Sequence, residues 1–473
     1  MPRLTAAVTL LLAVVAGVGC DRGEWPRSQE FEQAAGDAGS GGAAEQPTAA
    51  TTGGVAGEPA SGTQRRYATQ EQGVFPKDRV LDVQVTMPPE AWTTLIATAK
   101  QETWSTAAVT IDGQRLGEIG FRPKGEYSLD SCIDDTGQLI CDKLSFKLKF
   151  SEVDPDKRFH GLKRLVLNQI HDGWGLYVET LAYQIFNSFG ITAPRTSYAV
   201  LTVNGESLGI YRVVEAVDGR FTDLHFSDHD GNLYKEAWPV STSDGYFQAA
   251  LKTNEETASN DAFIAFSADM LAASDDELPR TLAKYMDLDR MLDYMAVDYA
   301  IANWDGITTF YAGSWGHSNH NYYMYQDVDA PRFTLIPWDL NAVLFLDHWL
   351  GDIEPWDTLD VDCDTPIPTE DGDLGTLSAA CDPTIRALAL SRDGYHASVR
   401  RLLDEVFVVD KLSDQIDEYA RQVSPVMHDD PFVPYAEVSL GAQYVKSALG
   451  TMRSRLEAVL NEGDTGGGGA GSE

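Results

Sequence analysis

The sequence lacks the short motifs of several common enzyme classes. It has no Walker Gly-x-x-x-x-Gly-Lys-Ser/Thr loop and no Gly-x-Gly-x-x-Gly segment following a predicted strand, so a P-loop NTPase or a Rossmann enzyme is not supported. Neither a Gly-x-Ser-x-Gly elbow nor a His-Glu-x-x-His helix occurs, which argues against α/β-hydrolases and zinc proteases. Any chemistry must therefore come from another arrangement of side chains.

Positive charge is also scarce. The chain has 36 Lys and Arg residues against 72 Asp and Glu residues, which gives a formal net charge of −36 and a pI near 4.4. A field of this sign repels DNA, RNA and anionic lipid, so nucleic acid is not an expected partner. The negative charge favours binding of divalent cations or basic polypeptides, although in most acidic proteins it only keeps the surface well hydrated.

The only long apolar run is at the N-terminus. Arg3 precedes the run from Leu4 to Val18, and Gly19-Cys20 follows it, which is the pattern of a secretory signal too short to span a membrane. Ending on a cysteine, it resembles a bacterial lipoprotein signal with Cys20 as the lipidated residue. Gly17 stands where that motif usually has Leu, so ordinary cleavage is the alternative. Both outcomes predict export to the bacterial cell envelope. Lipidation would make the lipid on Cys20 the only membrane contact, whereas ordinary cleavage would give a periplasmic or extracellular protein.

Composition divides the rest of the chain. Residues 21–72 consist mainly of small and polar residues and predict a disordered tether, and residues 463–473 form a Gly-rich tail. Between them, residues 73–462 can bury a sizeable core, since 43% of the chain is hydrophobic. We expect the folded domain there.

Cysteine is rare, with five residues in all. Apart from Cys20, four remain, and in an oxidising compartment they predict two disulfides. Pairing of neighbours joins Cys132 to Cys141 and Cys363 to Cys381, although sequence leaves the other two connectivities open. A zinc site is less expected because no Cys-x-x-Cys pair occurs.

Strands are predicted first and helices later. Alternating apolar residues from Val80 to Met87 predict a half-buried strand, and Asp112-Gly113 and Asn204-Gly205 predict two hairpin turns. In the segment from Lys143 to Phe150, apolar residues share one face and lysines the other. After a helix from Trp174 to Phe189, most periodic segments are helical, so the chain is predicted to be α+β. The later helices are predicted around Thr384 to Phe407, Asp410 to Gln422 and Leu440 to Leu460.

The stretch from Met286 to Asn341 combines three polar residues with regular elements. Apolar residues at helical spacing predict a helix that ends just before Asp305. Runs from Tyr322 to Val328 and from Phe333 to Ile336, joined by Asp329-Ala330-Pro331, predict a hairpin that carries Asn321 and Asp339 at its ends. Kinase-type phosphotransferases place a base and magnesium ligands in this order, with an acid, an Asn and a second acid.

Three segments carry a resemblance to the CotH kinase family. They are Asn303-Trp304-Asp305, Asn321-Tyr322-Tyr323 and Ile336-Pro337-Trp338-Asp339-Leu340. The Arg122-Pro-Lys124-Gly125 segment, the hairpin with Gly209, Tyr211 and Glu215, and Gly231-Asn-Leu-Tyr-Lys235 are similar to further family elements. The resemblance implies a two-lobed, atypical protein-kinase-like fold with a strand-rich N-lobe at about 73–215 and a mainly helical C-lobe at about 216–462.

The resemblance also implies roles for three residues. Asp305 is the catalytic acid/base or faces a metal, Asp339 is a ligand of Mg²⁺ or Mn²⁺, and Asn321 helps to orient metal or phosphate. For Asp305 and Asp339 the alternative is a local cap or turn.

Nucleotide contacts are expected from the strand-rich part. Lys124 and Lys147 are the candidates for contacts to the ATP phosphates. Lys149 is the alternate if the strand register differs by one face. Arg122 is either another phosphate contact or a bridge between carboxylates. Glu179 could be the acidic partner of a lysine, as in kinases, although a surface position is the alternative. Glu215, at the predicted cleft, could accept a hydrogen bond from a nucleotide.

Other polar residues have simpler interpretations. His317 and His320 are expected to be polar loop residues, and the acidic segment from Asp352 to Asp382 is expected to be a solvated loop. Asn341 stands where the family usually has a second Asp, and an amide offers a metal only a neutral oxygen.

The leading hypothesis is a metal-dependent kinase that transfers the γ-phosphoryl group of ATP to Ser or Thr of an exported or surface protein. Because ATP is scarce outside the cell and Asn341 departs from the family pattern, the alternative is a non-catalytic binding or adhesion module. A metal-dependent phosphoesterase is disfavoured, since the carboxylates lack the usual His/Asp cluster.

Overall fold

The computed structural model describes residues 73–125, 127–227, 230–313, 316–327, 332–346, 355–368 and 375–465. All of them belong to one compact unit that spans Ala60–Glu473. The predicted signal segment, the tether and the turn at 329–331 lie outside the described residues, and so does Glu126 beside the Arg122–Gly125 segment. The interpretations of those segments therefore stay predictions.

Seven strands form a closed barrel in the order β1-β2-β3-β4-β5-β7-β6. Neighbours pair antiparallel except β1 and β6, which are parallel, with Leu81 opposite Ala199. That pair closes the sheet. The two hairpin turns are confirmed, since Asp112, Gly113, Asn204 and Gly205 all have positive φ, as such tight turns require. The strands are β1 (Leu81–Thr86), β2 (Ser105–Ile111), β3 (Gln114–Lys124), β4 (Ser145–Lys149), β5 (Arg164–Gln169), β6 (Thr196–Val203) and β7 (Glu206–Val214).

The barrel encloses its own hydrophobic core, to which the alternating apolar residues of each strand contribute. Phe121 and Phe146 stack inside it with ring centroids 4.7 Å apart. The predicted outward row of lysines is wrong at Lys143, which is 2% exposed and donates from Nζ to the carbonyl of Ile210 at 3.0 Å. Lys143 precedes β4, so the alternation of the strand does not extend to it.

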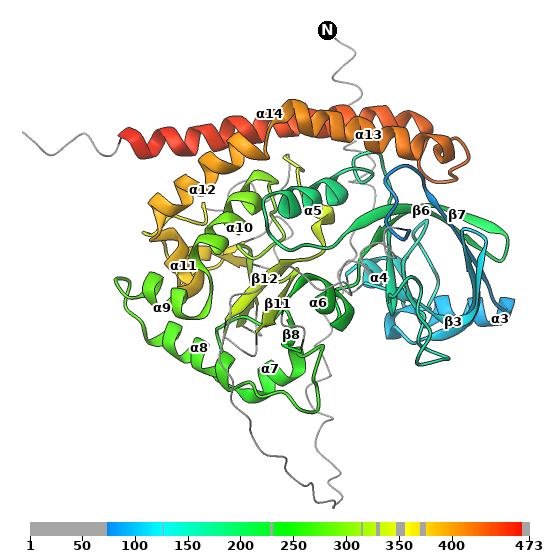
Figure 1. The fold of residues 1–473 in the computed structure, drawn as a ribbon, viewed down its shortest axis with the longest axis horizontal. Coiled ribbons are helices and arrows are strands. Elements are labelled where there is room, and N and C mark those ends of the chain that lie inside the picture. Colours follow the sequence, from blue (N-terminus) through cyan, green and yellow to red (C-terminus); the bar gives the residue numbers. More distant parts are fainter. Residues whose placement is uncertain are drawn as a thin grey trace, which may run out of the picture. The chain divides into compact units, whose positions relative to one another are not determined.

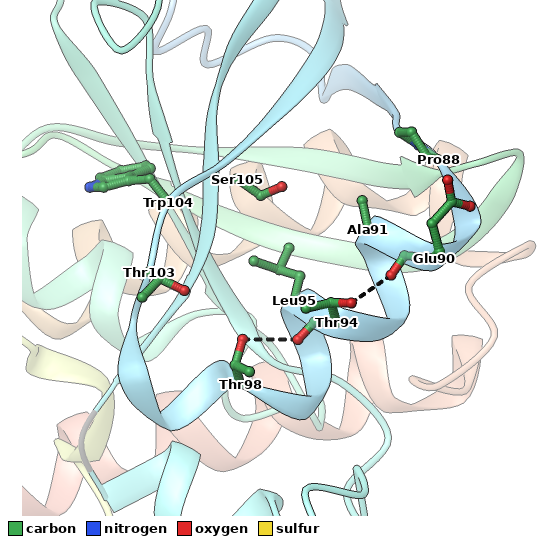
Figure 2. A pocket seen from close by; sticks show the side chains of 9 residues that line it. All are labelled: Pro88, Glu90, Ala91, Thr94, Leu95, Thr98, Thr103, Trp104 and Ser105. Atoms are coloured by element: carbon green, nitrogen blue, oxygen red, sulfur yellow. Dashed lines mark hydrogen bonds between the residues drawn. The ribbon is translucent and has the colours of Figure 1, made fainter.

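Around the barrel lie α3 (Pro89–Ala97), η2 (Ala99–Gln101) and α4 (Tyr127–Cys132). Figure 2 shows a pocket between α3 and the start of β2, where the hydroxyls of Thr94 and Thr98 donate to the carbonyls of Glu90 and Thr94 one turn earlier. The pocket contains none of the predicted site residues, so these hydroxyls serve their own helix.

The helical part has a second hydrophobic core, which also includes α5 (Val178–Ser188). The buried stripe predicted for residues 286–302 is confirmed in α10 (Leu288–Ala300), where Met291, Leu292 and Met295 are buried. The predicted hairpin is β11 (Tyr322–Gln326) and β12 (Phe333–Pro337), and β8 (Asn232–Lys235) pairs with β11 as a third strand. The other helices are α6 (Gly219–His225), α7 (Asp244–Ala250), α8 (Asp261–Ala272) and α9 (Leu278–Tyr285).

A four-stranded sheet includes part of the segment that was predicted to be a solvated acidic loop. Its order is β10-β9-β14-β13, with β9 (Phe310–Gly313), β10 (Gly316–Ser318), β13 (Ile367–Pro368) and β14 (Gly375–Leu377). β14 pairs with β9, which follows Asp305, so the acidic segment lies against the predicted site. Both predicted disulfides are present, Cys132–Cys141 and Cys363–Cys381.

Five elements complete the C-terminal part: η4 (Ala379–Cys381), α11 (Pro383–Ala389), α12 (Arg392–Glu405), α13 (Val409–Met427) and α14 (Tyr435–Thr465). The last two lie side by side (Figure 1). Since α14 ends at Thr465, the start of the predicted tail at residue 463 is helical. Among the helices of the described ranges, none is both long and apolar enough to cross a bilayer.

The α+β class is therefore confirmed, with a strand-rich first part and a mainly helical second part. A closed barrel was not predicted, because its closing pair joins strands more than a hundred residues apart in the chain. The two-lobed arrangement stays a prediction.

Candidate active site

Asp305 follows the end of α10, and three side chains hold its carboxylate. Oδ1 accepts the hydroxyl of Tyr311 at 2.6 Å and lies 2.8 Å from Nε2 of His320. Oδ2 accepts from Nδ2 of Asn321 at 2.9 Å. Burial alone would lower the pKa of His320, but the hydrogen bond and the charge of Asp305 raise it, so the contact with the carboxylate favours the protonated imidazole. Asp305 therefore has a fixed orientation with most of its acceptor capacity used.

The loop that carries Asp305 is braced from within α10. Asn303 donates from Nδ2 to Oδ1 of the buried Asp298 at 2.7 Å, and burial raises the pKa of Asp298 to about 7. Gly306 must be glycine here, because a Cβ would come within 2.3 Å of the Asn303 amide nitrogen. The Asn-Trp-Asp segment thus owes its shape to a buried carboxyl that sequence reasoning did not single out.

The hairpin brings Asn321 and Asp339 to the same end of β11 and β12. Tyr322 pairs with Pro337, and the backbone N–H of Trp338 donates to the Asn321 carbonyl at 3.0 Å. Both polar residues adopt left-handed backbone conformations, with φ of 65° at Asn321 and 53° at Asp339. Such strain in residues other than glycine is typical of functional sites. The charges of Asp305 and Asp339 both raise the pKa of His320.

The donors of this region suit a hard divalent cation. Carboxylate and amide oxygens are the ligands that Mg²⁺ prefers, and Nδ2 of Asn321 is engaged by Asp305, which leaves its Oδ1 to face a metal. In the described part of the chain, no three His, Cys, Asp or Glu side chains form a ready metal cage. Mg²⁺ usually takes only one or two carboxylates and completes its shell with phosphate and water, so the residues present fit a metal that arrives with a nucleotide. Asn341, in η3 (Leu340–Ala342), is exposed.

Lys124 belongs to a buried polar chain of four residues. Its Nζ donates to Oδ1 of Asn168 at 3.0 Å, and Nδ2 of Asn168 donates to Oε1 of Glu179 at 3.0 Å. Arg212 forms the ion pair with Glu179, at 2.8 Å. The predicted lysine–glutamate pair is thus indirect, with an amide in between. The surface position considered for Glu179 is wrong, since the residue is 0% exposed.

Lys147 lies among other cations. Burial lowers its pKa to about 7, and the charges of Lys124, Arg122 and Lys235 act in the same direction. Arg122 is paired with Glu102 at 2.7 Å. Lys149, the alternate phosphate residue, pairs with Glu152 at 2.6 Å and lies over Trp104.

A contact between aromatic ring and ammonium joins the barrel lysines to the metal-binding candidates. Nζ of Lys124 lies 5.9 Å from the ring centroid of Trp338, the residue before Asp339. The backbone N–H of Asp339 donates at 3.0 Å to the hydroxyl of Tyr183, one turn beyond Glu179 on α5. Candidate phosphate and metal residues thus lie beside one another.

Glu215, at the end of β7, is fully buried in a cluster of its own. Arg195 donates to both carboxylate oxygens, at 2.9 and 2.5 Å, and His225 lies 3.3 Å from Oε2. Burial opposes ionisation, but these partners lower the pKa of Glu215 to about 2. Its nucleotide contact stays a prediction that would require these bonds to open.

Several residues of this region were missed or undervalued by the sequence reasoning. His320 is a loop residue, as expected, but it contacts Asp305, and its position next to Asn321 was the available signal. Glu236 follows the family-like segment that ends at Lys235, and its Oε1 accepts the backbone N–H of Asn321 at 3.3 Å. No sequence signal identified Tyr311, Asn168 or Arg212, because tertiary packing alone brings them to their partners.

Comparisons with known proteins identify the family of this chain. The profile of the CotH kinase protein family matches residues 121–448, which is more than half of the chain. The chain therefore belongs to the CotH kinase family. A kinase-like role is the activity that this membership supports.

Two curated relatives come from Bacillus subtilis. The inner spore coat protein H-like protein is 23% identical over 285 residues, which cover 60% of this chain and 75% of the relative. Inner spore coat protein H is 21% identical over 308 residues, which cover 61% of this chain and 75% of that relative. Spore coat protein homolog 1 of Rhizopus delemar is 23% identical over 281 residues, which cover 54% of this chain and 43% of that relative. Among solved structures, the Helicobacter pylori proinflammatory kinase CtkA aligns with a TM-score of 0.34 and 13% identity, covering 67% of this chain and 93% of that one.

Proposed function

We propose that this protein is an exported atypical protein kinase that transfers the γ-phosphoryl group of ATP to Ser or Thr of an exported or surface protein, with Mg²⁺ or Mn²⁺. Membership of the CotH kinase family supports the reaction class. The two disulfides and the spore coat relatives fit an exported protein. We also propose the two-lobed arrangement, with the cleft between the barrel and the helical part.

One observation carries the proposal: the charges that gather around Lys147. The charges of Lys124, Arg122 and Lys235 all disfavour its ammonium form, and Glu102, which is paired with Arg122 at 2.7 Å, offsets them in part. In the part of the chain that the structure describes, no carboxylate forms an ion pair with Lys147 itself. Like charges in a half-buried place are costly unless an anion joins them. A polyphosphate would supply that anion, beside the segment that carries Asp339.

The proposed mechanism assigns each residue one task. The cations of the barrel bind the phosphates, while Asp339 and Oδ1 of Asn321 would hold the metal, which would neutralise phosphate charge. Asp305, held by Tyr311 and His320, orients the acceptor hydroxyl through Oδ2 and receives its proton. The bond from the acceptor oxygen to the γ-phosphorus forms, and the bond from that phosphorus to the ADP oxygen breaks.

Incubation of the purified protein with γ-labelled ATP and Mg²⁺ or Mn²⁺ tests this function. We expect label on a Ser or Thr of the protein or of an added acceptor, and its loss in Asp305→Ala and Asp339→Ala. Asp404→Ala removes an exposed aspartate of α12 and is the matched control. Label that persists in both site variants would contradict the assignment.

The alternative is a non-catalytic surface binding or adhesion module with the same fold. The observation that favours it is Asn341, where the family usually has a second acid. Calorimetry separates the two, because an adhesion module would bind neither ATP nor the metal complex of ATP.

Lipid attachment at Cys20 is a separate proposal. It predicts that Cys20→Ala moves the protein from the membrane fraction to the soluble exported fraction. An unchanged distribution would instead support ordinary cleavage of the signal.

A further inference from the structure

A buried amide separates the candidate phosphate lysine from its acidic partner. Asn168 on β5 lies opposite Arg212 on β7. All four members of the chain, Lys124, Asn168, Glu179 and Arg212, are at most 8% exposed. Their spacing is set by bonds of 3.0 Å from Lys124 to Asn168, 3.0 Å from Asn168 to Glu179 and 2.8 Å from Arg212 to Glu179.

The chemistry of this position calls for an amide. The residue must accept a hydrogen bond from an ammonium on one side and donate a hydrogen bond to a carboxylate on the other. Asn does both, since it has an acceptor oxygen and a donor nitrogen, whereas an ionised Asp only accepts. The amide orientation is therefore fixed by its two charged neighbours.

The arrangement also leaves a net charge in the protein interior. Arg212 neutralises Glu179 and Asn168 is neutral, so among the described residues no carboxylate is bonded to Lys124, whose Nζ donates to the Asn168 amide instead. A direct lysine–glutamate pair would have cancelled that charge. The uncompensated charge is at the Lys124 end, beside Trp338 and within the field of Lys147.

We propose that Asn168 is a positioning residue that holds Lys124 toward the cleft and keeps it uncompensated, so that phosphate of the nucleotide becomes its counter-ion. This inference rests on the proposed nucleotide site and deepens it. Arg212 has the complementary task, because its guanidinium prevents Glu179 from neutralising the lysine.

The test measures binding of inorganic tripolyphosphate and of ATP to the full-length protein by calorimetry at pH 8 without divalent metal. Asn168→Asp places a carboxylate against Lys124, and we expect affinity for both probes to fall at least tenfold. Gln169→Glu is the matched control, because it adds the same charge to the next residue of β5, which points to the opposite face. We expect a change of less than threefold there.

A double-mutant cycle separates positioning from general damage. If Asn168 acts through Lys124, Asn168→Asp weakens binding little further in the Lys124→Met background. Urea unfolding checks that each variant folds. Should Asn168→Asp fail to fold, Asn168→Leu removes the bridge at similar volume, and a three- to tenfold loss that again disappears with Lys124→Met is expected.

The outcomes distinguish the two ideas. Wild-type protein that binds neither tripolyphosphate nor ATP without metal overturns this inference. If it also fails to bind ATP in the presence of Mg²⁺, the proposed function is overturned with it. Wild-type protein that binds them, with Asn168→Asp equally tight or with additive losses in the cycle, overturns the role of Asn168 alone.

Discussion

Single residues determine how the Asp305 carboxylate is oriented. Tyr311 and His320 both contact Oδ1, and their rings stack with centroids 5.1 Å apart. Asn321 contacts Oδ2 at 2.9 Å. Oδ2 keeps a free lone pair that can accept a hydrogen bond from the hydroxyl of the phosphoryl acceptor. The proton of that hydroxyl therefore has one defined destination. Preorganised contacts of this kind matter most when charge moves.

We expect Tyr311→Phe to lower the rate of label transfer about tenfold, since a hydrogen bond to a charged group contributes about 1.5–3 kcal/mol. Affinity for ATP should change little, because Tyr311 contacts Asp305 and none of the barrel lysines. Initial rates over a range of ATP concentrations measure both quantities. Tyr435→Phe, at an exposed tyrosine, is the control, and an equal loss there would argue against a specific role.

Lys147 gives a prediction for pH. Its pKa falls from 10.5 to about 7 on folding, so between these pH values the unfolded chain binds more protons and stability rises with pH. Without a phosphate ligand, Lys147→Met should be more stable than wild type at pH 7, by about 1–2 kcal/mol after allowance for partial exposure. The difference should shrink as pH rises to 10.

Urea unfolding at pH 7 and pH 10 in phosphate-free buffer measures this change. Lys149→Met lies on the same strand but loses the ion pair with Glu152, so it should not be stabilised at pH 7. A Lys147→Met protein that is less stable than wild type at pH 7 would contradict the interpretation that burial and neighbouring cations make the charged Lys147 unfavourable.

At the scale of elements, α5 links the two halves of the candidate site. Glu179 and Tyr183 are four residues apart and so share one face of the helix. Glu179 reaches Lys124 through Asn168, and Tyr183 holds the backbone of Asp339. The separation between the phosphate lysine and the metal-binding candidate is therefore fixed by one rigid helix.

Tyr183→Phe leaves the N–H of Asp339 without its acceptor. We expect affinity for the Mn²⁺ complex of ATP to fall about tenfold, equivalent to about 1.4 kcal/mol, whereas metal-free tripolyphosphate should bind as before. Calorimetry with both probes tests this. Tyr177→Phe removes another buried hydroxyl, bonded to the carbonyl of Val438 at 2.5 Å, and should leave both affinities unchanged.

At the scale of the molecule, the C-terminal helices fasten the helical part to the segment between β5 and α5. The hydroxyl of Tyr177 donates to the carbonyl of Val438 at 2.5 Å. At Gly441 the backbones come so close that a Cβ would lie 1.9 Å from the carbonyl oxygen of Gly173. Asp430 likewise bonds the N–H of Ile210 at 2.6 Å, beside Gly209. These contacts hold α14 and the loop before it against elements more than 200 residues earlier.

Gly441→Ala should destabilise the protein by about 1–3 kcal/mol, because overpacking forces the backbones apart. Gly450→Ala in the same helix is the matched control. A Cβ there meets nothing within 4 Å, so the change should stabilise by about 0.5–1 kcal/mol. Urea midpoints of the two variants measure the difference, and equal effects would contradict the close approach.

Local sequence signals were sufficient for elements whose pattern and partner are near in the chain. The turn residues Asp112-Gly113 and Asn204-Gly205 identified hairpins, and apolar spacing identified α10 and the hairpin of β11 and β12. Neighbouring cysteines paired as favoured. Family resemblance, rather than spacing, selected Asp305, Asn321 and Asp339, whose roles stay predictions.

The sequence by itself determined the two barrel hairpin turns, helix α10, the hairpin of β11 and β12, the disulfide candidates and the family, because these depend on short-range periodicity, turn chemistry and motif residues. Only the tertiary structure decided the barrel closure through β1 and β6, the burial of Lys143, and the amide between Lys124 and Glu179. The physical reason is that a buried charge is stable only with particular partners, and those partners are brought together by packing between distant segments, which no local pattern encodes.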